Sequence, residues 1–161
     1  MLYAYLVTGK LNYKNVALDS FDFLLSKLFF KNQFKVISNN GWFHKGTAPN
    51  IYGEQPIDVS YTIQTLDLFY KTTKDIKFKN LQKKAFSWFL GENHLNQTMY
   101  NPITGGCYDG LEKTHVNLNQ GAESTICYLI ARLIMEKEAG LAPKYNRNRG
   151  LRKQFKIENT I

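Results

Sequence analysis

The sequence predicts an all-α fold of about two and a half helical hairpins joined by long loops. Two observations lead to this prediction: a repeat with a period of 65 residues, and apolar residues that recur at helical spacing within each repeat. At this offset three separate segments align: residues 8–16 with 73–81, 41–44 with 106–109, and 55–58 with 120–123. Agreement of three segments on one register indicates a repeated structural unit.

Each unit consists of two predicted helices followed by an irregular loop. Residues 55–72 have apolar side chains three and four positions apart, with Pro56 in the first turn, where proline is tolerated. Residues 76–91 repeat this pattern and stop at Gly91, a residue suited to a helix C-terminus. The polar residues 71–75 make a short connection, so the two helices are expected to form an antiparallel hairpin.

The same alternation of inner helix, outer helix and loop predicts the elements in the remainder of the chain. Residues 1–8 match the second half of an inner helix, 13–30 an outer helix, and 120–138 the inner helix of the next hairpin. The loops 33–53 and 92–118 are rich in turn residues and allow small β-hairpins. Five aromatic residues with helical spacing are expected in the core: Phe21, Phe23, Phe86, Trp88 and Phe89.

The composition, with 43% hydrophobic and 21% charged residues among 161, is that of one globular domain. We place this domain at residues 1–141. No apolar run is long enough to span a membrane, and the start lacks the features of a signal peptide, so a cytoplasmic protein is expected. Cys107, Cys127 and the three histidines lack metal-ligand spacing, so no metal or other cofactor is expected.

Most of the positive charge lies in a basic tail at residues 142–161. From Lys144 onward the local balance is +5, out of a net charge of +8 for the whole chain. A short polar terminus of this kind is more often solvated than engaged with RNA. Nucleic acid is therefore not the expected partner, although an RNA-associated function stays open as a third alternative.

Four polar residues are predicted to share one rim of the fold. The repeat superposes His44 on Asp109 in the loops, and Asp58 on Glu123 in the first turns of the following helices. Loops at one end of stacked helical hairpins face a common opening. Paired carboxylates at an opening are typical of glycoside chemistry, in which one is the acid and the other the base or nucleophile. The candidate catalytic residues are Asp109 as the acid, Glu123 as its charged partner, and Asp58.

Each of these carboxylates also has a structural interpretation. Asp58 and Glu123 occupy the third helical position if Gln55 and Gln120 begin the helices, and a carboxylate there hydrogen-bonds the capping residue and offsets the helix dipole. Asp109 precedes a glycine, a pair common in turns. The carboxylates are therefore either catalytic groups or caps.

Aromatic and amide side chains beside the rim are candidates for sugar binding. Aromatic faces can stack on sugar rings, and amides offer paired donors and acceptors to hydroxyl groups. The candidates are Trp42, His44, Gln55, Tyr61, Tyr108, Asn119 and Gln120. The aromatic members are equally suited to anchoring loops, and Asn119 to capping a helix.

Four strings in the chain resemble a known superfamily: QPID at 55–58, FSWFLGEN at 86–93, YNPITGGCYDGL at 100–111 and VNLNQGAEST at 116–125. They are similar to the helical C-terminal region of bacterial glycosyltransferase-like and mannosyltransferase-like proteins in the six-hairpin (α/α toroid) glycosidase-like superfamily. The resemblance covers roughly residues 1–138. It implies a partial α/α toroid, carbohydrate as the ligand, and a glycosyltransferase domain as a partner in a full-length protein.

A complete toroid of this kind has six hairpins, whereas this sequence predicts fewer than three. Terminal repeats normally need caps over their apolar faces, and none is visible at the N-terminus. We therefore expect either a piece of a larger toroid or a protein that completes its core by self-association. Two functions are nearly equal in rank: a carbohydrate-active toroid fragment that binds sugar at its loop rim, and a non-catalytic helical module that binds glycan or supports a transferase domain.

Overall fold

The computed structural model describes residues 1–30, 33–44, 46–138 and 140. Helices dominate these residues, which confirms the predicted helical class. The helices are α1 (Leu2–Thr8), α2 (Leu11–Leu28), α3 (Pro56–Thr73), α4 (Ile76–Ser87) and α5 (Ala122–Glu138). Two small antiparallel hairpins lie between them, as the loops allow: β1 (Phe29–Phe30) pairs with β2 (Gln33–Phe34), and β3 (Gly110–Leu111) pairs with β4 (Val116–Asn117).

The 65-residue repeat is visible in the backbone at the helix ends. The residue that ends α1, Gly9, and the residue that ends α3, Lys74, both adopt the left-handed conformation, with φ of 69° and 61°. The next residues, Lys10 and Asp75, share φ of −75° and ψ of 116° and begin α2 and α4. The hairpin α1–α2 is therefore the local equivalent of α3–α4, and α1 corresponds to the second half of α3.

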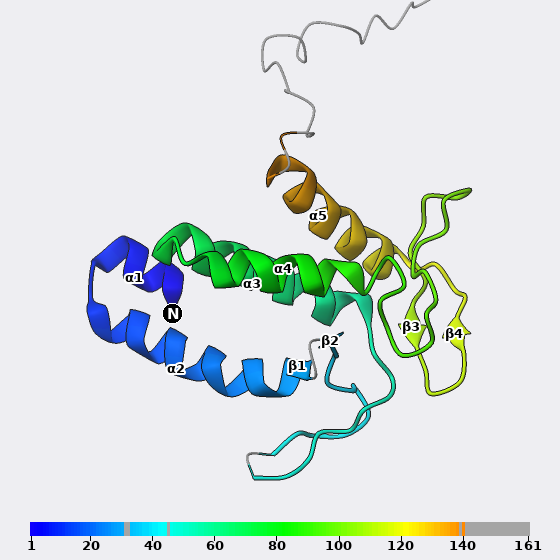
Figure 1. Cartoon of the computed structure of the whole chain (residues 1–161), viewed down its shortest axis with the longest axis horizontal. Coiled ribbons are helices and arrows are strands. Elements are labelled where there is room, and N and C mark those ends of the chain that lie inside the picture. The colour runs from blue at the N-terminus through cyan, green and yellow to red at the C-terminus, as the bar shows by residue number, and fades with distance from the viewer. Residues whose placement is uncertain (31–32, 45, 139, 141–161) are drawn as a thin grey trace, which may run out of the picture.

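Helix α3 is the central element of the fold. It contacts α4, α5 and α1. Figure 1 shows α3 and α4 side by side through the middle of the molecule, with α5 rising from their right-hand end and α2 lying below them. Helices α1, α3 and α5 thus pack in succession, while α2 and α4 are the second helices of the two hairpins.

Stacked aromatic rings join the two hairpins. Phe69 of α3 forms a three-ring cluster with Phe21 of α2 and Phe78 of α4, whose ring centroids lie 4.6 and 4.9 Å from its own. All three side chains are buried. Close-packed rings of this size contribute strongly to a small core, so this stack holds α2 against the rest of the fold.

The core prediction is correct for three of the five aromatic residues and needs correction for Phe23. Phe21, Trp88 and Phe89 are buried, and Phe86 packs at the edge of the core. Phe23 instead remains 37% exposed, whereas Trp88, its equivalent in the repeat, is 0% exposed. The reason is that Phe23 stacks on Phe43 of the following loop, with ring centroids 5.8 Å apart, and not on a neighbouring inner helix.

Two helix ends differ from the predicted positions. The helix expected to run to Gly91 ends at Ser87, because the Asn93 side chain donates to the Trp88 carbonyl and residues 88–91 continue as turns. Helix α5 begins at Ala122, two residues after the expected start. Helix α3 begins as expected, with Gln55 as its N-cap residue.

A buried carboxylate ties the start of α3 to the long loop after α4. The Glu54 side chain is 2% exposed, and its Oε2 accepts a hydrogen bond of 2.6 Å from Trp88 Nε1. Its Oε1 lies 3.4 Å from Nδ1 of His94, and the other ring nitrogen of His94 lies 2.8 Å from the Glu112 carbonyl oxygen. Burial raises the pKa of Glu54, against the opposing effects of the Trp88 hydrogen bond and of the neighbouring His94 and Lys35.

The basic tail and the expected domain boundary at residue 141 lie outside the described residues. Among the described helices, none combines the length and the apolar character needed to cross a lipid bilayer.

We predict that Trp88→Phe lowers the free energy of unfolding by about 1.5–3 kcal/mol, because it removes a hydrogen bond to a buried carboxylate. Trp42→Phe is the matched control, since Trp42 is 90% exposed and should change stability by no more than about 0.5 kcal/mol. Urea unfolding followed by far-ultraviolet circular dichroism measures both. Equal stability of the two variants would contradict the role of Glu54.

Candidate active site

Asp58 and Glu123 lie in the first turns of α3 and α5, the two packed inner helices. Their carboxyl groups are close enough to interact electrostatically. Desolvation raises the pKa of Asp58 above its ordinary value of 3.8, and the negative charge of Glu123 raises it further. Both residues nevertheless remain exposed to solvent at the rim. The repeat therefore brings two like-charged groups together, as predicted for this pair.

The capping-box interpretation finds no hydrogen bond to support it. Within the described residues, the carboxyl groups of Asp58 and Glu123 make neither a hydrogen bond nor an ion pair, and the side chain of Gln55 makes no capping bond. The favourable interaction with the helix dipole remains, because both residues occupy a first turn.

Asp109 has a different role from the one expected for a proton donor. Its Oδ1 accepts a hydrogen bond of 2.8 Å from the backbone N–H of Gly121, directly before α5. Its own N–H donates to the Asn119 carbonyl oxygen at 2.9 Å. A Cβ atom on Gly121 would lie 2.9 Å from Asp109 Oδ1, so glycine permits this close approach. Asp109 therefore anchors the start of α5.

The predicted amide ligands also support the loop. The Thr104 hydroxyl donates to Oε1 of Gln120. The same side chain lies against Gly106, where a Cβ atom would come within 2.2 Å of Oε1. Asn119 and Gln120 are exposed and directly precede the start of α5, near Glu123 in the chain. Their contacts, however, hold the 92–118 loop.

The predicted aromatic residues separate into two places. Tyr61 is 61% exposed and lies one turn after Asp58 on α3, where both line a pocket of about 260 Å³ between α2 and α3. Tyr108 is half-buried and packs against the core, and its N–H donates to the Met99 carbonyl oxygen at 2.9 Å.

The expectation that His44 and Trp42 share the rim of the acids needs correction. Both residues are exposed on the loop whose Phe43 stacks on Phe23 of α2. Figure 1 shows this loop hanging below α2, on the opposite side of α3 from α5. The Phe23–Phe43 stack keeps this loop on α2, so the four polar residues do not converge on one place.

Two cysteines adjoin the acids, and their sequence spacing predicts no role for either. Cys127 lies one turn after Glu123, and its thiol pKa is raised by desolvation and by the charges of Glu123 and Asp58. Burial, Asp109 and Cys127 raise the pKa of the Cys107 thiol to about 12, and its Sγ lies 3.1 Å from the Met99 carbonyl oxygen. The helical spacing between Glu123 and Cys127 was the signal that could have placed this thiol at the rim.

Among the described residues, no three histidine, cysteine, aspartate or glutamate side chains are grouped so that they could hold a metal ion. Neither the protein-family models nor the curated proteins compared with the chain match it. The chemistry of the site is therefore inferred from its geometry, whose main features are two adjacent carboxyl groups, an exposed tyrosine and a nearby thiol.

We predict opposite effects on stability for two of the acids. Asp58→Asn should stabilise the fold at pH 7 by up to about 0.5 kcal/mol, because it removes the cost of a charge beside Glu123 at a solvent-exposed position. Since the folded-state pKa is raised, this gain should vanish as the pH falls below 3.8, where Asp58 is protonated in both states. Asp109→Ala should instead destabilise the fold by about 1 kcal/mol through loss of the contact at the start of α5. Thermal unfolding between pH 3 and 8 measures both, and a stabilising Asp109→Ala would contradict the anchoring role.

We predict that iodoacetamide at pH 8 modifies Cys127 in the folded protein and leaves Cys107 unmodified until the protein unfolds, because only the thiolate reacts. Glu123→Gln should accelerate modification of Cys127 by lowering its thiol pKa. Asp22→Asn on α2 serves as the charge-matched control. Mass spectrometry of the peptides gives both rates, and an unchanged rate in Glu123→Gln would show that the two groups are not in contact.

Proposed function

We propose that the chain is a carbohydrate-active part of an α/α toroid, and that it binds a sugar at the rim formed by the starts of α3 and α5. The observation that carries this proposal is the juxtaposition of Asp58 and Glu123, with the pKa of Asp58 raised. The succession of inner helices α1, α3 and α5 with outer helices α2 and α4 supports membership of the six-hairpin glycosidase-like superfamily.

The two acids suit the division of labour in glycoside chemistry. One carboxyl group must hold a proton for the leaving oxygen while the other stays ionised as base or nucleophile. Neighbouring carboxyl groups with separated pKa values provide such a pair. Asp58 is the proposed proton donor, because desolvation and Glu123 favour its protonated form. Glu123 is the proposed charged partner.

The surroundings of the pair suit a sugar more than an extended polyanion. The exposed ring of Tyr61 can stack on a pyranose, and Thr62 lines the same pocket with a hydroxyl group. Gln55 directly precedes the first turn of α3, and its side chain makes no capping bond. Two adjacent negative groups would repel phosphate, so neutral hydroxyl-rich ligands are favoured.

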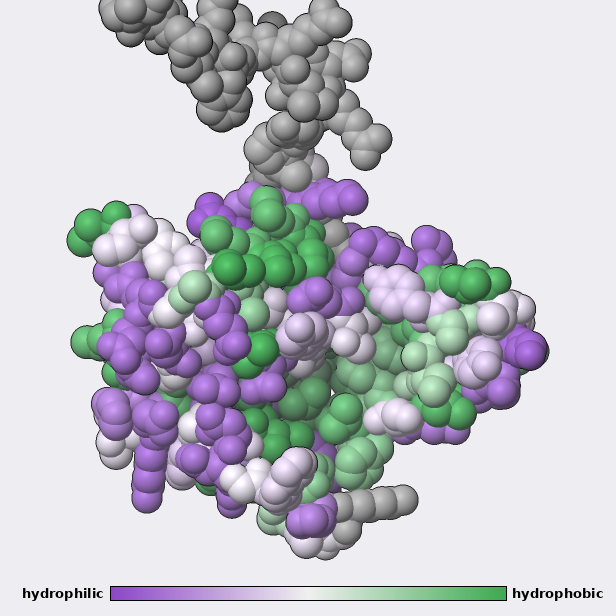
Figure 2. Space-filling view, turned by 180° about the vertical axis from the view of Figure 1, so that it is seen from behind, coloured by the Kyte–Doolittle hydropathy of each residue, from purple (hydrophilic) through white to green (hydrophobic). Residues whose placement is uncertain are grey.

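A second function is supported by the surface of α5. Ile126, Leu129, Ile130 and Leu133 recur at intervals of three and four residues and are 38–55% exposed. Figure 2 shows hydrophobic surface gathered near the top of the molecule in this view. An apolar stripe of this kind suits contact with a neighbouring domain, such as a transferase, for which the helical unit would be a non-catalytic support. The RNA-associated alternative depends on the tail, which lies outside the described residues.

We predict that saturation-transfer NMR with a panel of mono- and oligosaccharides detects at least one ligand of the intact chain. Because a lost hydrogen bond to a charged group is worth about 1.5–3 kcal/mol, Glu123→Gln should weaken binding about 10- to 100-fold. Asp22→Asn, a change of the same charge on the exposed side of α2, should leave binding unchanged. Hydrolysis of the bound sugar, abolished by Asp58→Asn, supports the catalytic function. Binding without turnover supports a non-catalytic glycan-binding module, and the absence of any sugar binding contradicts the proposed sugar site.

A further inference from the structure

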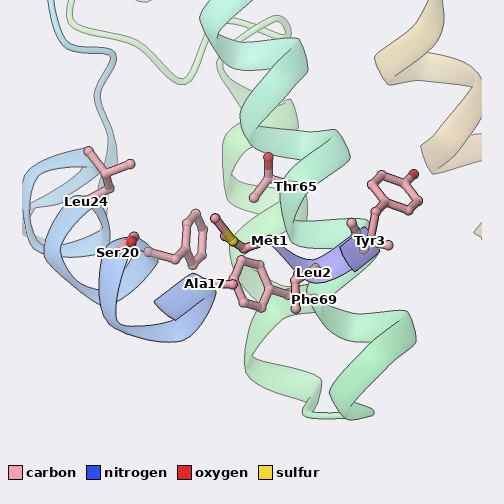
Figure 3. Close-up of a pocket in the computed structure, with 10 residues that line it drawn as sticks. Met1, Leu2, Tyr3, Ala17, Ser20, Leu24, Thr65 and Phe69 are labelled. Carbon is pink, nitrogen blue, oxygen red and sulfur yellow. The ribbon is translucent and has the colours of Figure 1, made fainter. Parts of the chain in front are cut away.

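Glu54 and His94 form an ionisable pair that ties the start of α3 to the loop after α4. The pocket beside α1 in Figure 3, by contrast, is lined by apolar and hydroxyl side chains, with no carboxylate, imidazole or lysine side chain among its described lining residues. The Glu54 side chain is 2% exposed and that of His94 is 22% exposed. The carboxyl group is therefore buried, while protons can enter and leave the pair through the ring.

Both ring nitrogens of His94 face acceptor oxygens. Nδ1 lies 3.4 Å from Oε1 of Glu54, and Nε2 lies 2.8 Å from the Glu112 carbonyl oxygen. A carbonyl oxygen only accepts hydrogen bonds, so Nε2 must carry a hydrogen atom. A second proton is then needed between Nδ1 and Oε1, held either by the ring or by the carboxyl group. In both arrangements the pair shares one proton.

Loss of the shared proton breaks one of the two contacts of the ring. Glu54 is then a carboxylate, and His94 is a neutral ring with a single N–H group. Two acceptor atoms meet at Oε1 of Glu54 if the hydrogen stays on Nε2, or at the Glu112 carbonyl oxygen if it moves to Nδ1. A buried carboxylate that loses a donor is costly. Desolvation accordingly raises the pKa of Glu54, against the Trp88 hydrogen bond.

Charged and aromatic groups surround the pair. Lys35 favours the charged form of Glu54. The Tyr52 ring meets the His94 ring edge-on, with centroids 5.3 Å apart, and the ammonium groups of Lys35 and Lys113 lie 5.1 and 5.7 Å from the Tyr52 centroid. The remaining charged group of this part of the loop is the Glu112 carboxylate, which lies beside Gly110, where a Cβ atom would come within 3.7 Å of its Oε1.

We propose that the Glu54–His94 pair is a pH-sensitive latch, closed while it holds one shared proton and open once that proton has passed to solvent. The closed latch keeps the Glu112 backbone beside Glu54, next to Leu111, whose N–H donates to the Glu54 carbonyl oxygen at 2.9 Å. Imidazole is the side chain that ordinarily exchanges a proton between about pH 5 and 8. Because the closed state binds a proton that the open state releases, rising pH through this range favours opening.

The latch reaches the rim through the β3–β4 hairpin. Asp109 directly precedes β3, and its Oδ1 accepts a hydrogen bond from the Gly121 N–H before α5. Opening therefore loosens the segment that fixes the start of α5. This effect belongs to the fold itself, so the proposal does not depend on whether a sugar binds at the rim.

Hydrogen exchange of the intact chain, followed by NMR at pH 6 and pH 8.5, tests the latch through the buried amide of Leu111. Its protection factor, which corrects for base catalysis of exchange, should fall about tenfold or more in the parent, because the shared proton is lost. In His94→Gln the protection should stay equal within about twofold, because an amide does not titrate. His115→Gln, which changes an exposed histidine of the same loop, should keep the fall seen in the parent.

Glu54→Gln imitates the protonated carboxyl group, because its amide can donate to a neutral Nδ1 while its oxygen still accepts from Trp88. This variant should keep at pH 8.5 the protection that the parent has at pH 6. Nitrogen-15 NMR of the His94 ring in the parent needs no variant, and its shifts should change over the same pH range as the Leu111 protection. Equal protection in the parent at both pH values, ring nitrogens that do not titrate between them, or a fall that persists in His94→Gln or is lost in His115→Gln would overturn the proposal.

Discussion

The hydrogen bond between Trp88 and the buried carboxylate of Glu54 is the interaction on which the arrangement of the site depends. Glu54 immediately precedes the N-cap residue of α3, and its backbone also exchanges hydrogen bonds with Leu111 of the long loop. One residue thus fixes the end of α4, the start of α3 and the β3–β4 hairpin relative to one another. A buried carboxylate costs desolvation energy, so it persists only where donors such as the Trp88 indole compensate for that cost.

From this junction the position of each rim acid follows. Asp58 lies in the first turn of α3, and the loop held by Glu54 carries Asp109 to the start of α5. Asp109 then fixes Gly121, and Glu123 follows two residues later. The charges of Asp58 and Glu123 are therefore brought together by packed backbone elements, and their repulsion is tolerated because solvent reaches both groups.

The helices could be predicted from the sequence because apolar residues recur at helical spacing in each of them. The 65-residue repeat shows the same spacing in the equivalent helix. The start of α3 at Pro56 and the pairing of Asp58 with Glu123 follow directly from that repeat. The loops could not be predicted in the same way. His44 would match Asp109 only if the two loops had equivalent surroundings. The loop before α3 instead packs on α2 through Phe43, whereas Asp109 binds the start of α5. Glu54 gave no sequence signal, because its burial depends on Trp88, 34 residues away.

The central claim is that Asp58 and Glu123 form an electrostatically coupled pair in which the pKa of Asp58 is raised. Carbon-13 NMR of the side-chain carboxyl groups, followed through a pH titration of the parent and of Glu123→Gln, tests it most directly. The account predicts a pKa of Asp58 above its ordinary value of 3.8 in the parent and a lower pKa once the charge of Glu123 is removed. A pKa of Asp58 at or below 3.8 in the parent, unchanged in Glu123→Gln, would contradict it.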